Sequence, residues 1–212
     1  MPRTKPRLRG VSHQIAAFLA APAGAALVAG ANGSSARTAA ITYSLCLFGL
    51  FAVSALYHRP MWSVRARRLL WRLDHSAIFF LIAGTYTPFC MLLPPDVRGA
   101  ALAAVWIGAS LGTAVSLLWI SAPKRLMAAL YVLVGWIAVP VLPALATRLG
   151  AGALALLFTG GLLYTAGAAI YAWRRPDPYP TVFGFHEIFH LLVVAAAACH
   201  FVVVGAAIRV LG

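Results

Sequence analysis

The sequence predicts an all-α membrane protein, a bundle of seven transmembrane helices with a cytoplasmic N-terminus and an external C-terminus. Of the 212 residues, 62% are hydrophobic and only 10% are charged, a balance that is foreign to soluble domains of this size. Apolar runs recur along the whole chain, and each approaches the roughly 20 residues with which a helix crosses about 30 Å of hydrocarbon. The basic residues lie between these runs. We therefore expect one membrane domain, residues 1–212, in the cell membrane.

The apolar runs define the expected helices. We place them at about 12–31, 38–57, 76–94, 99–120, 126–146, 150–173 and 186–211. The first run is expected to stay in the protein as a helix rather than to be a cleaved signal, because six further runs follow it. Prolines inside the runs, such as Pro88 and Pro140, are expected to be ordinary kinks, since neighbouring helices can satisfy the freed backbone groups.

The basic residues indicate the orientation of the bundle. Seven helices put the two termini on opposite sides, and one side then receives thirteen of the 17 basic residues: Arg3, Lys5, Arg7, Arg9, Arg59, Arg65, Arg67, Arg68, Arg72, Lys124, Arg125, Arg174 and Arg175. The positive-inside rule assigns this side to the cytoplasm. The net charge of +13 is thus explained by topology, and we expect no nucleic-acid partner. An alternative for 59–72 is contact with anionic lipid, because Trp62 and Leu69 interleave with the arginines.

Acidic residues are rare, and two of them occupy unusual positions. Asp96 and Asp177 fall in expected loops, whereas Asp74 and Glu187 lie at the edges of apolar spans. An ionisable group at membrane depth costs at least about 2 kcal/mol unless it is paired or faces a polar cavity, so it indicates a functional site. The three cysteines occur singly in different spans, which predicts neither disulfides nor a thiolate metal site.

Three histidines are expected at the same depth as Asp74. His58 ends the second span, Asp74 precedes the third, and His186 and His190 open the seventh. The end of an even helix and the start of an odd helix lie on the same side of the membrane. All four side chains are therefore expected near the cytoplasmic end of the bundle.

This set of residues predicts a zinc site. His186 and His190 are four residues apart, so their rings lie on one helix face, and Ser54 and His58 are related in the same way. Three imidazoles with an open fourth position are typical of catalytic zinc, although three histidines alone do not exclude other metals. We predict His58, His186 and His190 as metal ligands, Asp74 as the general base for a water molecule and Ser54 as its hydrogen-bond partner.

Other residues near this set allow alternative interpretations. The segment His186–His190 also matches the zincin motif, in which the glutamate is a general base, but Glu187 can equally favour the positive N-terminus of its helix. His75 points about 100° away from Asp74 around the helix, which favours a packing role. His200 lies about 15 Å beyond His190, too far for the same ion, and His13 could join the polar shell of the site.

Several motifs in a fixed order resemble the hemolysin III family, the bacterial branch of the progestin and adipoQ receptors. The resemblance runs from Ser12 to about Arg209 and rests on Ser54–His58, Leu73–Phe79, Ile82–Phe89, Phe183–His190 and Cys199–Phe201. It implies seven helices, a cytoplasmic N-terminus and zinc held by His58, His186 and His190, with Ser54 and Asp74 close by. Compared with the receptors of this superfamily, the chain lacks a long N-terminal region and long outer loops, so a hormone-receptor role is not expected.

The superfamily also contains alkaline ceramidases, and this likeness implies a chemistry. We expect a zinc-dependent hydrolase of a membrane lipid, such as a ceramide-like amide, that enters sideways between helices. Two alternatives remain open: a non-catalytic sensor or structural protein stabilised by zinc, and a cytolytic membrane protein as the family name suggests.

Overall fold

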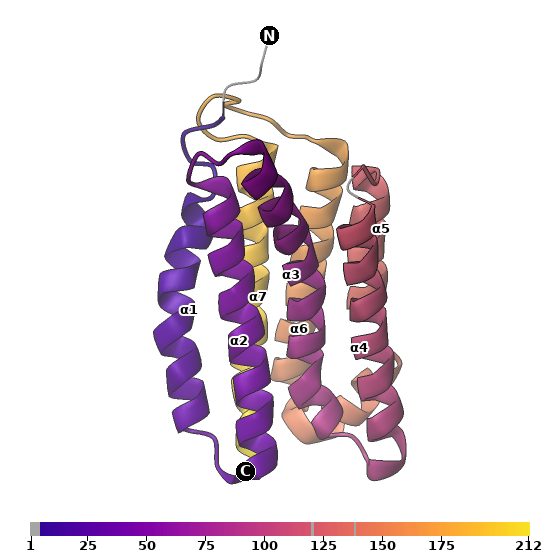
Figure 1. Ribbon diagram of the computed structural model, residues 1–212. Helices are drawn as coiled ribbons and strands as arrows, with labels where there is room; N and C mark the ends of the chain where they lie inside the picture. The colour runs from indigo at the N-terminus through magenta and orange to yellow at the C-terminus, as the bar shows by residue number, and fades with distance from the viewer. Residues whose placement is uncertain (1–4, 120, 138) are drawn as a thin grey trace.

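The chain folds into a bundle of long helices (Figure 1). The computed structural model describes residues 5–119, 121–137 and 139–212. Within these residues lie seven α-helices and one short 3-10 helix: α1 (Val11–Ala29), α2 (Gly33–His58), α3 (Val64–Met91), α4 (Pro95–Leu118), α5 (Lys124–Gly135), η1 (Val139–Val141), α6 (Leu142–Trp173) and α7 (Phe185–Leu211). The two ends of the chain lie at opposite ends of the bundle (Figure 1). We call the end at which α1 begins the entry end.

The surface of the bundle is that of a multi-pass membrane protein. The helices α1, α2, α4, α6 and α7 are each long and apolar enough to cross a membrane. Large apolar side chains point outward, for example Phe18, Leu45 and Leu133, which are 74%, 66% and 68% exposed. A soluble protein rarely exposes such an apolar surface, whereas lipid solvates it well. The prediction of an all-α membrane protein is confirmed.

The last helix is the centre of the bundle. α7 packs against α1, α2, α3 and α6, so side chains on several of its faces are enclosed by protein. Its buried residues run from His186 near the entry end to Ile208 near the C-terminus. Because α7 begins at the entry end, the polar side chains of its first turns are surrounded by the ends of the neighbouring helices.

The third helix differs from its predicted bounds. It begins at Val64, twelve residues before the predicted start at Ser76. The hydroxyl oxygen of Ser63 accepts a hydrogen bond from the backbone N–H of Ala66, 3.3 Å away, which caps the first turn. Hydropathy marks only the part of a helix that lies in hydrocarbon, and the arginine-rich first turns of α3 extend beyond it. Asp74 therefore lies inside a continuous helix and not at its start.

The fifth predicted span, 126–146, is not one helix. α5 ends at Gly135, and η1 and the first turns of α6 follow from Val139 onward. Pro140 and Pro143 lack the backbone N–H that a continuous helix would use, so this apolar run is interrupted. Gly150 adopts a left-handed conformation (φ 78°), and the chain turns there into the long part of α6. The Tyr86 hydroxyl donates a hydrogen bond to the carbonyl oxygen of Gly135, where α5 ends.

Close packing between α2 and α3 provides a test of the fold. A Cβ atom added at the buried Gly84 would lie 2.7 Å from both the Cβ and the Sγ of Cys46. We expect Gly84→Val to lower the free energy of unfolding by about 1–3 kcal/mol, because the two helices must move apart. Thermal denaturation in detergent measures the effect. Gly49→Ala on α2 is the matched control, since an added Cβ there meets no atom within 4 Å; equal melting temperatures for the two variants would contradict the packing.

Candidate metal centre

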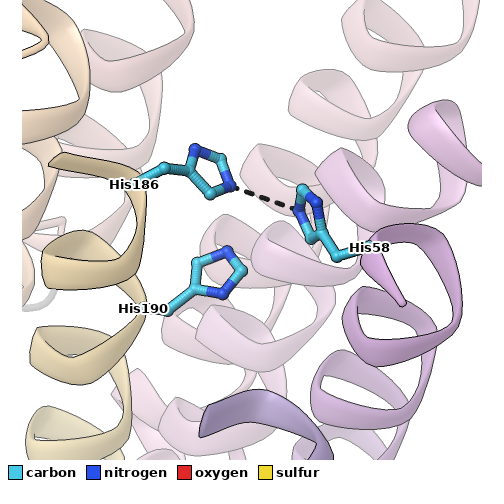
Figure 2. A group of neighbouring side chains, drawn as sticks. All are labelled: His58, His186 and His190. Atoms are coloured by element: carbon cyan, nitrogen blue, oxygen red, sulfur yellow. Dashed lines mark hydrogen bonds between the residues drawn. The ribbon is translucent and has the colours of Figure 1, made fainter. Parts of the chain in front are cut away.

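Three histidine rings from two distant segments meet at the entry end of the bundle (Figure 2). His58 is the last residue of α2, and His186 and His190 lie in the first two turns of α7. The Nε2 atoms of His58 and His186 are 3.2 Å apart. The ring of His190 lies 4.9 Å from the ring of His58 and 4.5 Å from that of His186, measured between centroids. One ligand atom from each residue lies within 4.8 Å of the other two, so the group could hold a metal ion.

The three rings are removed from bulk solvent. His58, His186 and His190 are only 7%, 9% and 2% exposed. Aromatic side chains surround them, with the rings of Tyr171 and Phe189 5.8 Å and 5.7 Å from that of His186. In such an enclosed place the attraction between a cation and its ligands is weakly screened.

The spacing between one nitrogen atom of His58 and one of His186 fits a tetrahedral metal ion. Two imidazole nitrogens at about 2.0–2.1 Å from one zinc ion lie about 3.3 Å apart in tetrahedral geometry. The 3.2 Å between the Nε2 atoms of His58 and His186 matches this value. Two imidazole nitrogens this close must share a proton or a cation, because two lone pairs facing each other repel. The donor set therefore fits zinc.

Asp74 lies beside the same nitrogen atom. Its Oδ2 atom is 3.7 Å from Nε2 of His58, the nitrogen that also faces His186. The side chain of Ser54, one turn before His58, is buried near the Asp74 carboxylate. The structure thus brings all five predicted residues together, and the carboxylate adjoins the space between the rings.

The carboxylate of Glu187 has other partners. One oxygen accepts a hydrogen bond from the backbone N–H of Gly184, at 2.7 Å, which caps the start of α7. The other forms an ion pair with the guanidinium group of Arg9. Both oxygens are engaged, which favours the helix-capping interpretation over that of a zincin base. Asp74 is then the acid that faces the histidines.

The other histidines lie in different surroundings. The ring of His75 also lies beside Asp74, with Nδ1 3.7 Å from Oδ2 of that carboxylate. The same Nδ1 is 3.0 Å from the carbonyl oxygen of Trp71, and Nε2 is 3.2 Å from the hydroxyl of Tyr171. His200 lies further along α7, where its Nε2 is 3.1 Å from the carbonyl oxygen of Leu157. His13 of α1 stacks on His190 with a centroid distance of 3.8 Å and an angle of 5° between the rings.

Sequence reasoning missed two of these contacts. The Arg9–Glu187 ion pair joins residues 178 positions apart. In the sequence, Arg9 indicates only the orientation of the bundle in the membrane. The sequence predicts that His13 could join the polar shell of the site, but not that its ring stacks on that of His190. The signal available for both was the position of Arg9 and His13 at the start of the first helix, which has to lie at the same end of the bundle as the histidines.

Comparison with known proteins gives consistent matches along the chain. The sequence model described as "Haemolysin-III related" matches residues 1–201, a range that contains all five predicted site residues. Hemolysin-3 of Bacillus cereus is 31% identical over 195 residues, which cover 90% of this chain and 86% of that protein. The heptahelical transmembrane protein ADIPOR2 of Oryza sativa subsp. japonica is 35% identical over 173 residues, which cover 72% of this chain and 74% of that protein.

Proposed function

The chain belongs to the haemolysin-III-related family of membrane proteins, and from this premise we propose that it is a zinc-dependent hydrolase of a membrane lipid. The observation that carries the proposal is the convergence of His58, His186 and His190 beside the carboxylate of Asp74. The substrate class we infer is a ceramide-like amide. With the excess of basic residues at the entry end, the site would lie near the cytoplasmic leaflet.

The residues of the site have separate tasks in this reaction. His58, His186 and His190 would hold the ion and leave a fourth position open. When bound, zinc supplies a Lewis acid for the amide carbonyl and lowers the pKa of a water molecule toward about 7. The Asp74 carboxylate, next to the space between the rings, would accept the proton of the attacking water and return it to the leaving amine. Ser54 would orient the carboxylate by a hydrogen bond.

A cavity inside the bundle supports a lipid as the substrate. Its volume is about 120 Å³, and its walls are almost entirely apolar. The helices α3, α5, α6 and α7 line it, through side chains that include Tyr131, Trp136, Phe158 and Phe189. Phe189 belongs to both the cavity and the surroundings of the site. Its side chain lines the cavity, and its ring lies 5.6 Å from that of His190. An acyl chain in this cavity would have its polar head close to the histidines.

Turnover of a defined lipid tests the function. Purified protein in detergent is incubated with ceramide, and the released fatty acid is quantified beside a His190→Ala variant. We expect release by the wild type and a loss of at least about 100-fold in the variant, because a metal ligand is gone. The melting temperature of each protein shows that both are folded. Equal turnover by the two proteins would rule out the mechanism.

A structural role for the ion is the second candidate. The three histidines come from α2 and α7, two helices that pack against each other, so an ion between them would cross-link the bundle. In that case, removal of zinc by a chelator lowers the melting temperature while the wild type releases no fatty acid. The name of the Bacillus cereus relative suggests a third function, lysis of membranes. A liposome leakage assay distinguishes it from the other two, because only a cytolytic protein releases a trapped dye.

A further inference from the structure

The segment that leads into α1 lies across the entry end of the bundle. The backbone N–H groups of Arg7 and Leu8 donate to the carbonyl oxygens of Thr181 and Val182 in the loop before α7, each at 3.1 Å. The amino group of Lys5 donates to the carbonyl oxygen of Arg59, directly after His58, at 2.9 Å. The segment is therefore attached both to the end of α2 and to the loop that leads into α7.

The next residues reach the ligand-bearing turns themselves. Gly10 has a left-handed backbone (φ 79°), and a Cβ atom at this position would lie 2.6 Å from the Cβ of His58. The backbone at Gly10 is thus in direct contact with the base of the His58 side chain, which only glycine permits. This contact limits how far His58 can swing away from α7.

Arg9 forms an ion pair with the first turn of α7. Its guanidinium group pairs with Glu187, which lies between His186 and His190 in the sequence and is only 3% exposed. The same carboxylate caps the helix through the N–H of Gly184. An ion pair at this point fixes the rotation of the turn from which both histidines project.

His13 contacts the ring of His190. It is 2% exposed, and its ring lies parallel to that of His190. Neither of its ring nitrogens has a hydrogen-bond partner among the described residues. The lone pairs of imidazole lie in the ring plane, so those of two stacked rings lie in separate parallel planes and do not converge on one ion. The geometry therefore makes His13 a stacking partner of a ligand and not a fourth ligand.

We propose that Arg9, Gly10 and His13 form a positioning clamp for the metal site, which holds the α7 turn, His58 and His190 in the binding arrangement. This inference rests on the proposed metal site and adds three positioning residues to it. The clamp explains how ligands from the end of one helix and the start of another, 128 positions apart, keep a common geometry. Residues that orient metal ligands typically contribute about 10–100-fold to metal affinity.

Zinc affinity of Arg9→Met tests the clamp. The dissociation constant is measured by competition with a chelator on purified, metal-free protein, together with the absorption spectrum of bound Co²⁺, which reports ligand geometry. We expect zinc binding about 10–100-fold weaker than in the wild type, with a weaker and shifted Co²⁺ band. Arg7→Met is the matched control: it removes the same charge from the same segment, but the Arg7 side chain is exposed, and it should bind zinc as tightly as the wild type.

Two substitutions of His13 provide an independent measurement. His13→Ala removes the ring that supports His190 and should weaken zinc binding to a similar extent. His13→Phe retains a flat ring without nitrogen atoms and should restore wild-type affinity and the wild-type Co²⁺ spectrum. A Phe variant as weak as the Ala variant contradicts the stacking role.

The outcomes distinguish the clamp from the metal site. If the wild type binds no zinc, the proposed function and the clamp are both wrong. If the wild type binds zinc and Arg9→Met and His13→Ala bind it equally well, only the clamp is wrong. Melting temperatures of the metal-free proteins are recorded in parallel, and a loss of affinity that merely follows a loss of folded protein also counts against positioning.

Discussion

We expect elemental analysis of the purified protein to find about one zinc ion per chain in the wild type, and almost none in a variant that combines His58→Ala, His186→Ala and His190→Ala. The reason is that the triple variant removes every nitrogen donor of the group that could hold the ion. Asp74 alone then offers a single carboxylate, which binds zinc far more weakly than three imidazoles do.

A histidine elsewhere on the same helix is the control for the zinc measurement. His200→Gln changes α7 ten positions beyond His190, at a site where the ring contacts the carbonyl oxygen of Leu157. This variant should retain the zinc content of the wild type. A triple variant that still holds a full equivalent of zinc would show that the ion is bound elsewhere.

The second large effect is expected at the carboxylate that adjoins the rings. Asp74→Asn keeps the size of the side chain and its contact with Ser54, but removes its ability to accept a proton. We expect the release of fatty acid from ceramide to fall by about 100- to 10,000-fold, the usual contribution of a general base, while the zinc content stays at the wild-type level. Product release and elemental analysis are measured on the same preparation.

The chain offers a matched acid for this experiment. Asp96 lies in the first turn of α4, at the opposite end of the bundle (Figure 1). Asp96→Asn removes the same charge at a distance from the histidines and should leave turnover unchanged. Full activity in Asp74→Asn would show that this carboxylate is not the general base of the reaction.

The depth of the site could be predicted from the sequence, and its lateral arrangement could not. Helix parity places the end of α2 and the starts of α3 and α7 at the same end of the bundle, which is where His58 and His186 lie. Helix parity does not predict that α7 lies at the centre of the bundle or that it contacts α2. That neighbourhood results from the packing of all the helices, and no local pattern at His58 or His186 encodes it.

The errors in the predicted helices have a related physical origin. A hydropathy run reports the surroundings of a segment and not its backbone conformation. α3 therefore starts twelve residues earlier than its apolar part, and the run 126–146 contains an interruption between Gly135 and Leu142 that its composition hides. The ion pair of Arg9 with Glu187 could not be predicted, because a basic residue near the N-terminus indicates the orientation of the bundle in the membrane whether or not it also forms an ion pair.

The shortness of α5 has a consequence for the surrounding bilayer. Twelve residues of helix rise about 18 Å, well below the roughly 30 Å of hydrocarbon around them. α5 alone is therefore too short to cross the bilayer, and the chain continues after Gly135 through η1 and α6. Val132, Gly135 and Trp136 at the end of α5 also line the apolar cavity. A hydrocarbon chain that passed from the lipid into the cavity here would exchange one hydrocarbon environment for another, so its transfer would cost little desolvation.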